Sequence, residues 1–273
     1  MPHSSRMVLG RQVDYNRRYD PDQLCPIPRS LGREAAGIEG AETFGHGVDI
    51  WNIFELSWLN ASGKPLVAMA EVRVPWNSPC LIESKSLKLY CNSFNMTALE
   101  SADELRLTMT RDLSRAAGAD VTVRIIAAEE FSQCTLAEPE GTCIDGLDIT
   151  DFTYEPDAAL LGTASDSARE TLFTRLFRSC CPVTGQPDWA TLRITYAGPR
   201  ILHDGLLRYL VSYREHQGFH EACVEKIHAD IHRHCGAQEL EVSARFTRRG
   251  GLDISPVRST RPGPWPNPRD PRQ

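Results

Sequence analysis

Alternation of apolar and polar residues predicts a β-hairpin in the first third of the chain. Along the segment "VDIWNIFELSWL", the side chains of Val48, Ile50, Asn52 and Phe54 fall on one side of an extended strand. The turn-forming stretch "ASGK" follows, and a second run, "PLVAMAEVRVP", comes after it. Two such runs around a short turn are typical of paired antiparallel strands.

A helical period replaces this alternation in the segment "SADELRLTMTRDLSRAAGA". Leu105, Met109 and Leu113 recur on one helical face. Ser101 is suited to cap the start of the helix, and Gly118 marks its end. The next stretch, "DVTVRIIAA", predicts another strand.

The second half of the chain repeats this order of elements. It contains a strand in "GQPDWATLRITY", two helices with a break near Gly218, and a strand in "ELEVSARF". "GKPLVAMAEVRV" aligns with "GQPDWATLRITY", and a second alignment matches Tyr90 with Tyr209 and Ser93 with Ser212. These matches predict an internal duplication.

The repeat suggests boundaries along the chain. Residues 1–45, rich in Pro, Gly and Arg and without a period, are expected to form an extended N-terminal arm. Residues 46–130 form the first expected module, 131–165 an acidic and turn-rich linker, and 166–273 the second module. The predicted fold class is α+β.

Composition narrows the class of protein. The chain has 273 residues, of which 41% are hydrophobic, and a formal net charge of −6, so we expect a soluble globular protein without direct nucleic-acid binding. No apolar run reaches the ~18–20 residues of a membrane span, and the N-terminal stretch lacks the apolar core of a signal peptide. Nine cysteines without a regular pattern favour reduced thiols and a cytoplasmic location.

A cysteine and an aspartate could carry chemistry in "SCCPVTGQPDW". Asp188 lies seven residues after Cys181, across a Gly-Gln-Pro turn, and a carboxyl group near a thiol can supply a proton. The alternative is a buried structural cysteine and a turn aspartate. The spacing to Asp188 favours Cys181 over its neighbour Cys180, which receives no role.

Polar residues at a predicted helix start form a second candidate. His220 and Glu221 follow Gly218, and both can face one cavity only near a helix terminus. They could hold a polar heterocycle. The alternative is an acid that favours the helix N-terminus, beside a surface histidine.

Cationic residues form a third candidate. Arg248 and Arg249 precede two glycines, and Lys85 and Lys88 of "ESKSLKLY" share one helical face. Both groups suit phosphate, although a charged edge strand or a solvated helix would look the same. No Gly-rich dinucleotide fingerprint and no P-loop occurs in the sequence.

The two modules differ at these candidates. The acid and lysines of "IESKSLKLY" are absent from the aligned "ILHDGLLRYL", and the Cys and Asp of "CCPVTGQPDW" are absent from "WLNASGKPLV". We therefore expect each half to supply part of one site.

In their order and spacing, "ESKSLKLY", "CPVTGQPDWA", "FHE" and "FTRRGGLDI" resemble the long, two-module type of NADPH-dependent 7-cyano-7-deazaguanine reductase. These enzymes are nitrile reductases of queuosine biosynthesis, a tRNA modification pathway. The resemblance covers nearly the whole chain. It implies two tandem tunnelling-fold (T-fold) modules, with antiparallel sheets and helices packed on one face, in a homodimer without a catalytic metal.

The resemblance also implies an activity. The nitrile of the deazapurine substrate is reduced to a primary amine through a cysteine thioimide, with two NADPH consumed per nitrile. The implied catalytic residues are Cys181 and Asp188. The implied substrate-binding residues are Ile82, Glu83, Ser84, His220 and Glu221. The implied cofactor-binding residues are Ser84, Lys85, Arg249 and Gly250.

Two other functions remain open on the residues alone. A non-catalytic T-fold module could bind a pterin or purine, but it would not need Cys181 with Asp188. A metal-dependent cyclohydrolase would need a metal-binding set, for which only "HADIHRHC", from His228 to Cys235, offers candidates.

Overall fold

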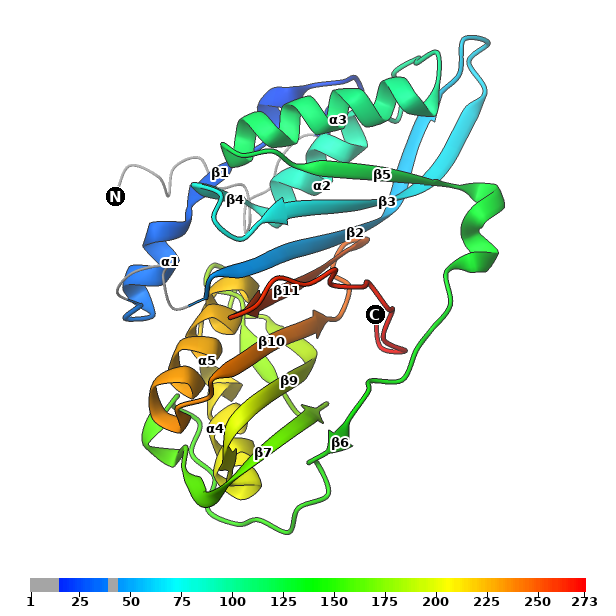
Figure 1. The fold of residues 1–273 in the computed structure, drawn as a ribbon. Coiled ribbons are helices and arrows are strands. Elements are labelled where there is room, and N and C mark those ends of the chain that lie inside the picture. The colour runs from blue at the N-terminus through cyan, green and yellow to red at the C-terminus, as the bar shows by residue number, and fades with distance from the viewer. Residues whose placement is uncertain (1–14, 39–43) are drawn as a thin grey trace. The chain divides into compact units, whose positions relative to one another are not determined.

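The chain divides into two compact units, each assembled from segments that are distant in the sequence. The structure is a computed structural model that describes residues 15–38 and 44–273 (Figure 1). Unit 1 comprises Met1–Leu31, Asp49–Thr135 and Arg248–Ile254, and unit 2 comprises Gly32–Val48, Leu136–Thr247 and Ser255–Gln273.

Unit 1 contains the predicted hairpin and the helix that follows it. Its sheet has the order β5-β3-β2, and β3 pairs with β5 in antiparallel orientation from Ala68↔Ala127 to Arg73↔Thr122. The strands and helices of this region are, in chain order, β1 (Pro26–Pro28), β2 (His46–Leu59), β3 (Pro65–Pro75), β4 (Cys80–Ile82), α2 (Ser84–Ser93), α3 (Ala102–Ala117) and β5 (Thr122–Ala127).

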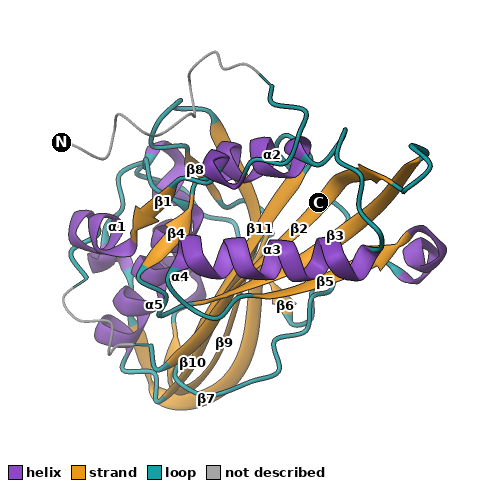
Figure 2. Ribbon diagram, turned by 90° about the horizontal axis from the view of Figure 1, so that it is seen from above, coloured by secondary structure: helices purple, strands orange, loops and turns teal. Residues whose placement is uncertain are grey.

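The core of unit 1 lies between this sheet and its helices. Leu105, Met109 and Leu113 of α3 are fully buried with Ala70 and Val72 of β3. Figures 1 and 2 show α2 and α3 on one face of these strands. The helical period of the sequence therefore identified the buried face of α3 correctly.

Unit 2 has the same two-layer construction. Its elements are, in chain order, β6 (Thr142–Cys143), β7 (Thr163–Thr174), β8 (Arg178–Cys180), β9 (Pro187–Ile201), α4 (His203–Val211), α5 (His220–Cys235), β10 (Glu239–Phe246) and, from Ser255 onwards, β11 (Leu252–Ser259). The strand order is β11-β10-β9-β7-β6, and β8 pairs with the start of β9.

Antiparallel pairing dominates the sheet of unit 2. β9 pairs antiparallel with β10, from Glu239↔Ala197 to Phe246↔Ala190, and only the short β6 runs parallel to its neighbour. Alternate residues of β9 and β10 are buried with the apolar faces of α4 and α5. Mixed α+β structure with mainly antiparallel strands confirms the predicted fold class at this level.

The prediction of an extended arm over residues 1–45 is wrong for part of that segment. Residues Arg29–Ala35 form helix α1, whose first residue, Arg29, is buried and ion-paired to Asp49 at 2.5 Å. The predicted arm also includes residues 1–14 and 39–43, which lie outside the described part of the chain. The proposed linker 131–165 contains β6 and the start of β7, and the domain boundaries stay a prediction.

The two helix pairs contain the same polar contacts. Tyr90 of α2 donates a hydrogen bond to Asp112 of α3 at 2.9 Å, and Tyr209 of α4 donates one to Asp230 of α5 at 2.7 Å. The two aspartates occupy the same position relative to the starts of their helices. Burial, followed by the charge of nearby groups, raises the pKa of both tyrosine hydroxyls, so they act as donors.

Two further features recur in both pairs. Ser93 Oγ donates to the Tyr90 carbonyl, and Ser212 Oγ donates to the Tyr209 carbonyl, both at 2.6 Å. Helix α3 ends at a left-handed glycine, Gly118, and α5 ends in the same way at Gly236. The residue matches seen in the sequence therefore correspond to matching contacts.

A buried ion network joins distant segments of unit 2. Glu225 of α5 accepts hydrogen bonds from Arg258 Nη2 at 2.8 Å and from Arg33 Nε at 2.9 Å. Arg258 is completely buried and Glu225 is 2% exposed. Because a buried charge needs a partner, the network explains why β11 carries an arginine inside the protein.

None of the described helices combines the length and apolar character required to cross a membrane.

Candidate active site

A tight turn in unit 2 positions the candidate nucleophile. Cys181 follows β8, and its backbone N–H donates to the Gln186 carbonyl at 2.8 Å, while Gly185 N–H donates back to the Cys181 carbonyl at 2.9 Å. β8 then pairs with β9 so that Ser179 lies opposite Asp188. Cys181 therefore lies two residues along the strand from Ser179, the residue that pairs with Asp188.

Strand geometry places these two side chains on the same side of the hairpin. Residues directly opposite in an antiparallel pair point to one face, and residues two apart do so as well. Cys181 (opposite Gln186) and Asp188 (opposite Ser179) thus share a face. Both are buried, with 2% and 4% of their surface exposed.

Cys180 projects from the other face of the hairpin. Its Sγ lies 3.7 Å from the Arg214 carbonyl and 3.8 Å from Arg178 Nη2. Its backbone N–H donates to the His216 carbonyl at 2.8 Å, and its carbonyl accepts from Gly218 N–H at 3.1 Å. Alternation thus supports Cys181, and not Cys180, as the neighbour of Asp188.

The start of α5 adds a histidine to this group. His220, the first residue of the helix, lies with Nε2 at 3.3 Å from Asp188 Oδ2. Its ring stacks on Phe246 with a centroid distance of 3.9 Å and an interplanar angle of 22°. Glu221, the next residue, is 3% exposed. In unit 2, the β8–β9 hairpin thus supplies a thiol and a carboxyl group, and the start of α5 supplies an imidazole and a second carboxyl group.

Glu83 is held at the start of α2 in unit 1. Its carboxylate caps the helix, accepting hydrogen bonds from the N–H groups of Lys85 at 2.8 Å and Ser86 at 2.9 Å. Its own N–H donates to the Cys25 carbonyl at 3.0 Å. The side chain is 1% exposed, and Ile82 before it is buried at the end of β4.

A glycine turn gathers positive charge in the same unit. Arg249 and Leu252 bond to each other through their backbones, and both central residues, Gly250 and Gly251, have positive φ values of +60° and +80°. Such a turn requires residues that tolerate the left-handed region, which glycine does.

Lysine and arginine side chains surround this turn. A Cβ added to Gly250 would lie 3.3 Å from Lys88 Nζ, and Arg248 stacks over Phe54 at 4.6 Å. Lys88 pairs with Glu55 at 3.4 Å. Lys85 and Ser84 begin the same helix and are half-buried. The cationic set suits the phosphates of a dinucleotide, whereas Gly251 is covered by Glu55, whose carboxylate carbon would lie 2.5 Å from an added Cβ.

The predicted residues thus form two groups, one in each unit. Cys181, Asp188 and His220 come together in unit 2, with Glu221 next in sequence; Glu83, Ser84 and Lys85 lie at the start of α2 in unit 1. Sequence reasoning missed the His220–Asp188 pair, the Phe246 ring beneath His220, and the position of Lys88 beside Gly250. The three-residue spacing of Lys85 and Lys88 was a signal for the last of these.

The stretch considered for metal binding lies inside unit 2. Within residues 15–38 and 44–273, no group of three His, Cys, Asp or Glu side chains is arranged to hold a metal ion. His228 is fully buried and contacts the Phe44 ring edge-on, with 5.6 Å between ring centroids.

Two protein-family models match the sequence. The model described as "Nitrile reductase, 7-cyano-7-deazaguanine-reductase N-term" matches residues 15–125, and the model described as "QueF-like protein" matches residues 187–263. The first match includes Glu83 and Lys85, and the second includes Asp188, His220 and Arg249.

Curated relatives match over almost the full chain. A protein of Desulfotalea psychrophila named NADPH-dependent 7-cyano-7-deazaguanine reductase is 49% identical over 97% of this chain and 96% of its own. Proteins of the same name from Burkholderia lata and Paraburkholderia phytofirmans are 50% and 51% identical, covering 97% and 95% of this chain and the same shares of their own.

A solved archaeosine synthase described as QueF-like covers 37% of this chain and 99% of its own, with a TM-score of 0.32 and 16% identity, values too low to support a conclusion about the fold. Identity near one half over the whole length confirms the resemblance seen in the motifs. The chain belongs to the family of NADPH-dependent 7-cyano-7-deazaguanine reductases, and it is an oxidoreductase.

Proposed function

We propose that the protein reduces the nitrile of 7-cyano-7-deazaguanine to the primary amine of 7-aminomethyl-7-deazaguanine, using two NADPH, in queuosine biosynthesis. The observation that carries this proposal is the group in unit 2. Cys181 and Asp188 share one face of a hairpin, and His220 contacts the aspartate. A nucleophile, an acid and a residue that orients the acid are the parts that nitrile activation requires.

In the proposed chemistry, Cys181 Sγ adds to the nitrile carbon while the nitrogen takes a proton. A bond forms between sulfur and carbon, and one of the C≡N π-bonds opens to give a thioimide. Asp188 donates the proton to the nitrogen and takes up the proton that the Cys181 thiol loses, because it is a buried carboxyl group on the same face as the thiol. His220 holds the Asp188 side chain in position through its Nε2 contact. NADPH supplies the hydride equivalents for both reductions.

We propose that Glu83, Ile82, Ser84, His220 and Glu221 bind the deazaguanine ring. A buried carboxylate is suited to accept hydrogen bonds from a guanine-like N–H and amino edge. Glu83 is fixed by its capping bonds. The rigid cap keeps the carboxylate in one orientation, which lowers the entropic cost of binding.

Ser84, Lys85, Arg249 and Gly250 are proposed to hold NADPH. The supporting observations are the cationic side chains around the Arg249–Leu252 turn and the absence of a Cβ on Gly250, which lies beside Lys88. Lys88 joins this group through its approach to Gly250. The extra phosphate of NADPH, compared with NADH, is expected to contact these cations.

For the architecture, we propose two tandem T-fold modules and a homodimer in the cytoplasm. The recurring Tyr–Asp and Ser–carbonyl contacts of the two helix pairs support a duplicated module. Two-fold dimers are the commonest homo-oligomers. Sedimentation of the active species tests the dimer, and an active species with the mass of one chain would contradict it.

The decisive experiment for the reaction uses the nitrile substrate without NADPH. Incubation should increase the mass of the protein by one substrate molecule and produce a new absorbance band from the thioimide. Adding NADPH should then remove the adduct and release the amine. A protein that binds the substrate without gaining mass, and that yields no amine with NADPH, would refute the proposed activity.

A further inference from the structure

The carboxylate of Glu55 lies against the glycine turn of unit 1. A Cβ added to Gly251 would be 2.5 Å from the Glu55 carboxylate carbon and 2.8 Å from its Oε1. The strand that carries Glu55 is held beside the turn, because the N–H of the neighbouring Phe54 donates to the Gly251 carbonyl at 3.0 Å. The close approach of the carboxylate thus depends on the absence of a side chain at Gly251.

The same carboxylate meets the cations gathered at the turn. Glu55 Oε2 lies 3.4 Å from Lys88 Nζ, which is itself beside Gly250. Arg249 begins the turn, and Arg248 precedes it. The Glu55 and Lys88 side chains are 62% and 29% exposed, and an exposed ion pair contributes little stability. The carboxylate can therefore leave Lys88 at low cost.

A phosphate group and this carboxylate would use the same features of the turn. Both are anions that accept charge-assisted hydrogen bonds from a lysine ammonium group. Both approach a backbone more closely where glycine leaves it without a Cβ. Two anions at one lysine repel each other, and the repulsion grows where water is partly excluded. A phosphate bound at Lys88 and the Glu55 carboxylate therefore exclude each other.

We propose that Glu55 and a phosphate of NADPH compete for Lys88, so that Glu55 sets the affinity of the protein for its cofactor. This inference rests on the cofactor site proposed above. When the phosphate binds, the carboxylate moves into solvent and Lys88 exchanges one anionic partner for another. A neutral side chain at position 55 leaves Lys88 available to the phosphate, and NADPH then binds more tightly.

The test is isothermal titration calorimetry of NADPH with the intact protein at low ionic strength, where charges are screened least. Glu55→Gln should lower the Kd for NADPH about threefold to tenfold. Lys88→Met, which keeps the apolar stem and removes the charge, should raise this Kd about tenfold. In the Lys88→Met background, Glu55→Gln should change the Kd less than about twofold, because the cation for which the two anions compete is absent.

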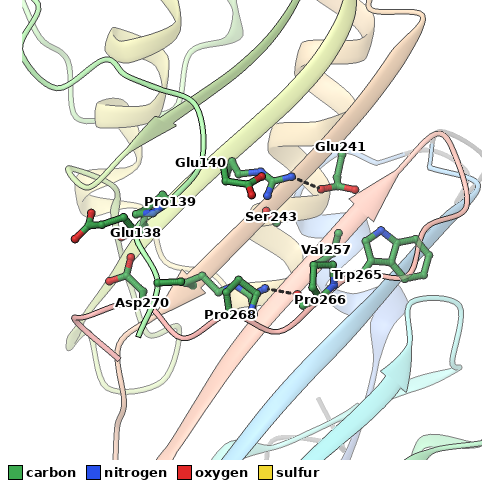
Figure 3. A pocket seen from close by; sticks show the side chains of 14 residues that line it. Glu138, Pro139, Glu140, Glu241, Ser243, Val257, Trp265, Pro266, Pro268 and Asp270 are labelled. Atoms are coloured by element: carbon green, nitrogen blue, oxygen red, sulfur yellow. Dashed lines mark hydrogen bonds and ion pairs between the residues drawn. The ribbon is translucent and has the colours of Figure 1, made fainter. Parts of the chain in front are cut away.

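Glu241 of unit 2 is the matched control. It lines a cavity of about 160 Å³ in that unit, together with Ser243 and Val257 (Figure 3). Its carboxylate pairs with Arg193 at 3.2 Å, a distance close to that between Glu55 and Lys88, but no glycine lines the cavity. Glu241→Gln should therefore change the Kd for NADPH less than about twofold.

Titration with NADH identifies which phosphate competes. NADH has the pyrophosphate of NADPH but lacks the phosphate on the adenine ribose. A gain in affinity from Glu55→Gln for NADPH alone assigns the ribose phosphate, whereas an equal gain for both cofactors assigns the pyrophosphate. Both results support the competition.

Three results would overturn the proposal. These are an unchanged or higher Kd for Glu55→Gln, an equal gain in the Lys88→Met background, and an equal gain from Glu241→Gln. Lys85→Ala and Arg249→Ala test the cofactor site separately. If both bind NADPH as the natural protein does, the site itself is wrong. If both bind it weakly and Glu55→Gln changes nothing, only the competition is wrong.

Discussion

The helix pairs α2–α3 and α4–α5 share their internal bonds but differ at their starts. Both contain a tyrosine bonded to an aspartate and a serine bonded to a carbonyl. At the start of α2, however, Glu83 caps the helix, whereas Leu202 precedes α4 without a side-chain cap. Contacts that hold the scaffold are thus present twice, while residues with candidate chemistry occur once.

The hairpins before these helices show the same division. The alignment that matches Gly63 with Gly185 places Leu59 and Leu66 of unit 1 at the positions of Cys181 and Asp188. Apolar residues at these positions can complete a hairpin but cannot attack a nitrile or donate a proton. The comparison teaches that the two helix pairs have packing contacts in common, whereas the candidate catalytic residues differ between the units.

The largest effect should come from the residue that has no chemical equivalent in unit 1. Cys181→Ala should lower turnover by on the order of a thousandfold or more and abolish the substrate adduct, because it removes the nucleophile. Mass spectrometry after incubation with the nitrile and steady-state turnover measure the two effects.

The matched control for this prediction is Cys180→Ala, which should leave both the adduct and turnover close to those of the natural protein. Its side chain lies on the opposite face of the hairpin. Loss of the adduct in Cys180→Ala alone would move the nucleophile by one residue.

A second difference, between α3 and α5, predicts how stability depends on pH. His228 of α5 occupies the position of Thr110 in α3, and burial lowers the pKa of His228 to about 3 from an ordinary 6.5. The unfolded chain then binds a proton that the folded chain excludes, so stability should fall as pH drops from about 6.5 towards 3. The loss should reach several kcal/mol, since one pKa unit is about 1.4 kcal/mol.

Replacing His228 by Phe should remove this part of the pH dependence. Denaturant unfolding at several pH values measures it, and His234→Gln, at an exposed position of the same helix, is the control. An identical fall in stability with pH for His228→Phe and the natural protein would contradict the assignment.

The shared Tyr–Asp contact offers a matched pair of variants. Tyr209→Phe should lower the free energy of unfolding by about 2–3 kcal/mol, and Tyr90→Phe by about 1–2 kcal/mol. Tyr209 also bonds to Tyr213 at 2.8 Å, so its loss removes a partner from the fully buried Tyr213 hydroxyl as well as from Asp230, which keeps its ion pair with Lys226 at 3.1 Å. After Tyr90→Phe, Asp112 keeps a bond from Tyr19 at 2.6 Å.

Chemical denaturation of the two variants measures this difference. A larger loss for Tyr90→Phe would mean that the two contacts are not equivalent in energy, although they match in geometry.

The smallest effects concern the helix starts. Leu202→Ser should raise the free energy of unfolding by about 0.5–1 kcal/mol by adding the missing cap to α4. Glu83→Leu, which copies the residue of the other helix pair, should lower it by about 1–2 kcal/mol and also raise KM for the nitrile. Separate effects on stability and on KM distinguish the two proposed roles of Glu83. A stability loss with unchanged KM would leave only the capping role.

Local patterns in the sequence were sufficient to predict the strands and helices in which apolar residues recur regularly. The strands β2, β3, β5, β9 and β10 and the helices α3 and α5 were predicted because apolar residues recur with a strand or helix period. β7 was missed because its first residues, "TASDSARE", are mostly polar and exposed. β11 was missed because it buries Asp253, Ser255 and Arg258, which are satisfied by partners far away in the sequence.

In the candidate site, too, local sequence patterns predicted only the contacts between residues close in the sequence. The seven-residue step from Cys181 to Asp188 is local, and hairpin geometry alone brings the two together. The contact of His220 with Asp188 and its stacking on Phe246 depend on how α5 and β10 pack, so no local spacing could reveal them. The resemblance of the motifs, and not periodicity, supplied the roles of His220 and Glu221.

The discontinuous composition of the two units has a consequence for protein synthesis. Residues 32–48 of unit 2 leave the ribosome before most of unit 1, and residues 248–254 of unit 1 emerge only after most of unit 2. Neither unit can be completed during translation until the last strand, β11, has been made. Because incomplete units expose unpaired strand edges and apolar surface, the growing chain should depend on chaperones. For the same reason, a gene cut between the modules would yield two pieces that each lack part of their own core.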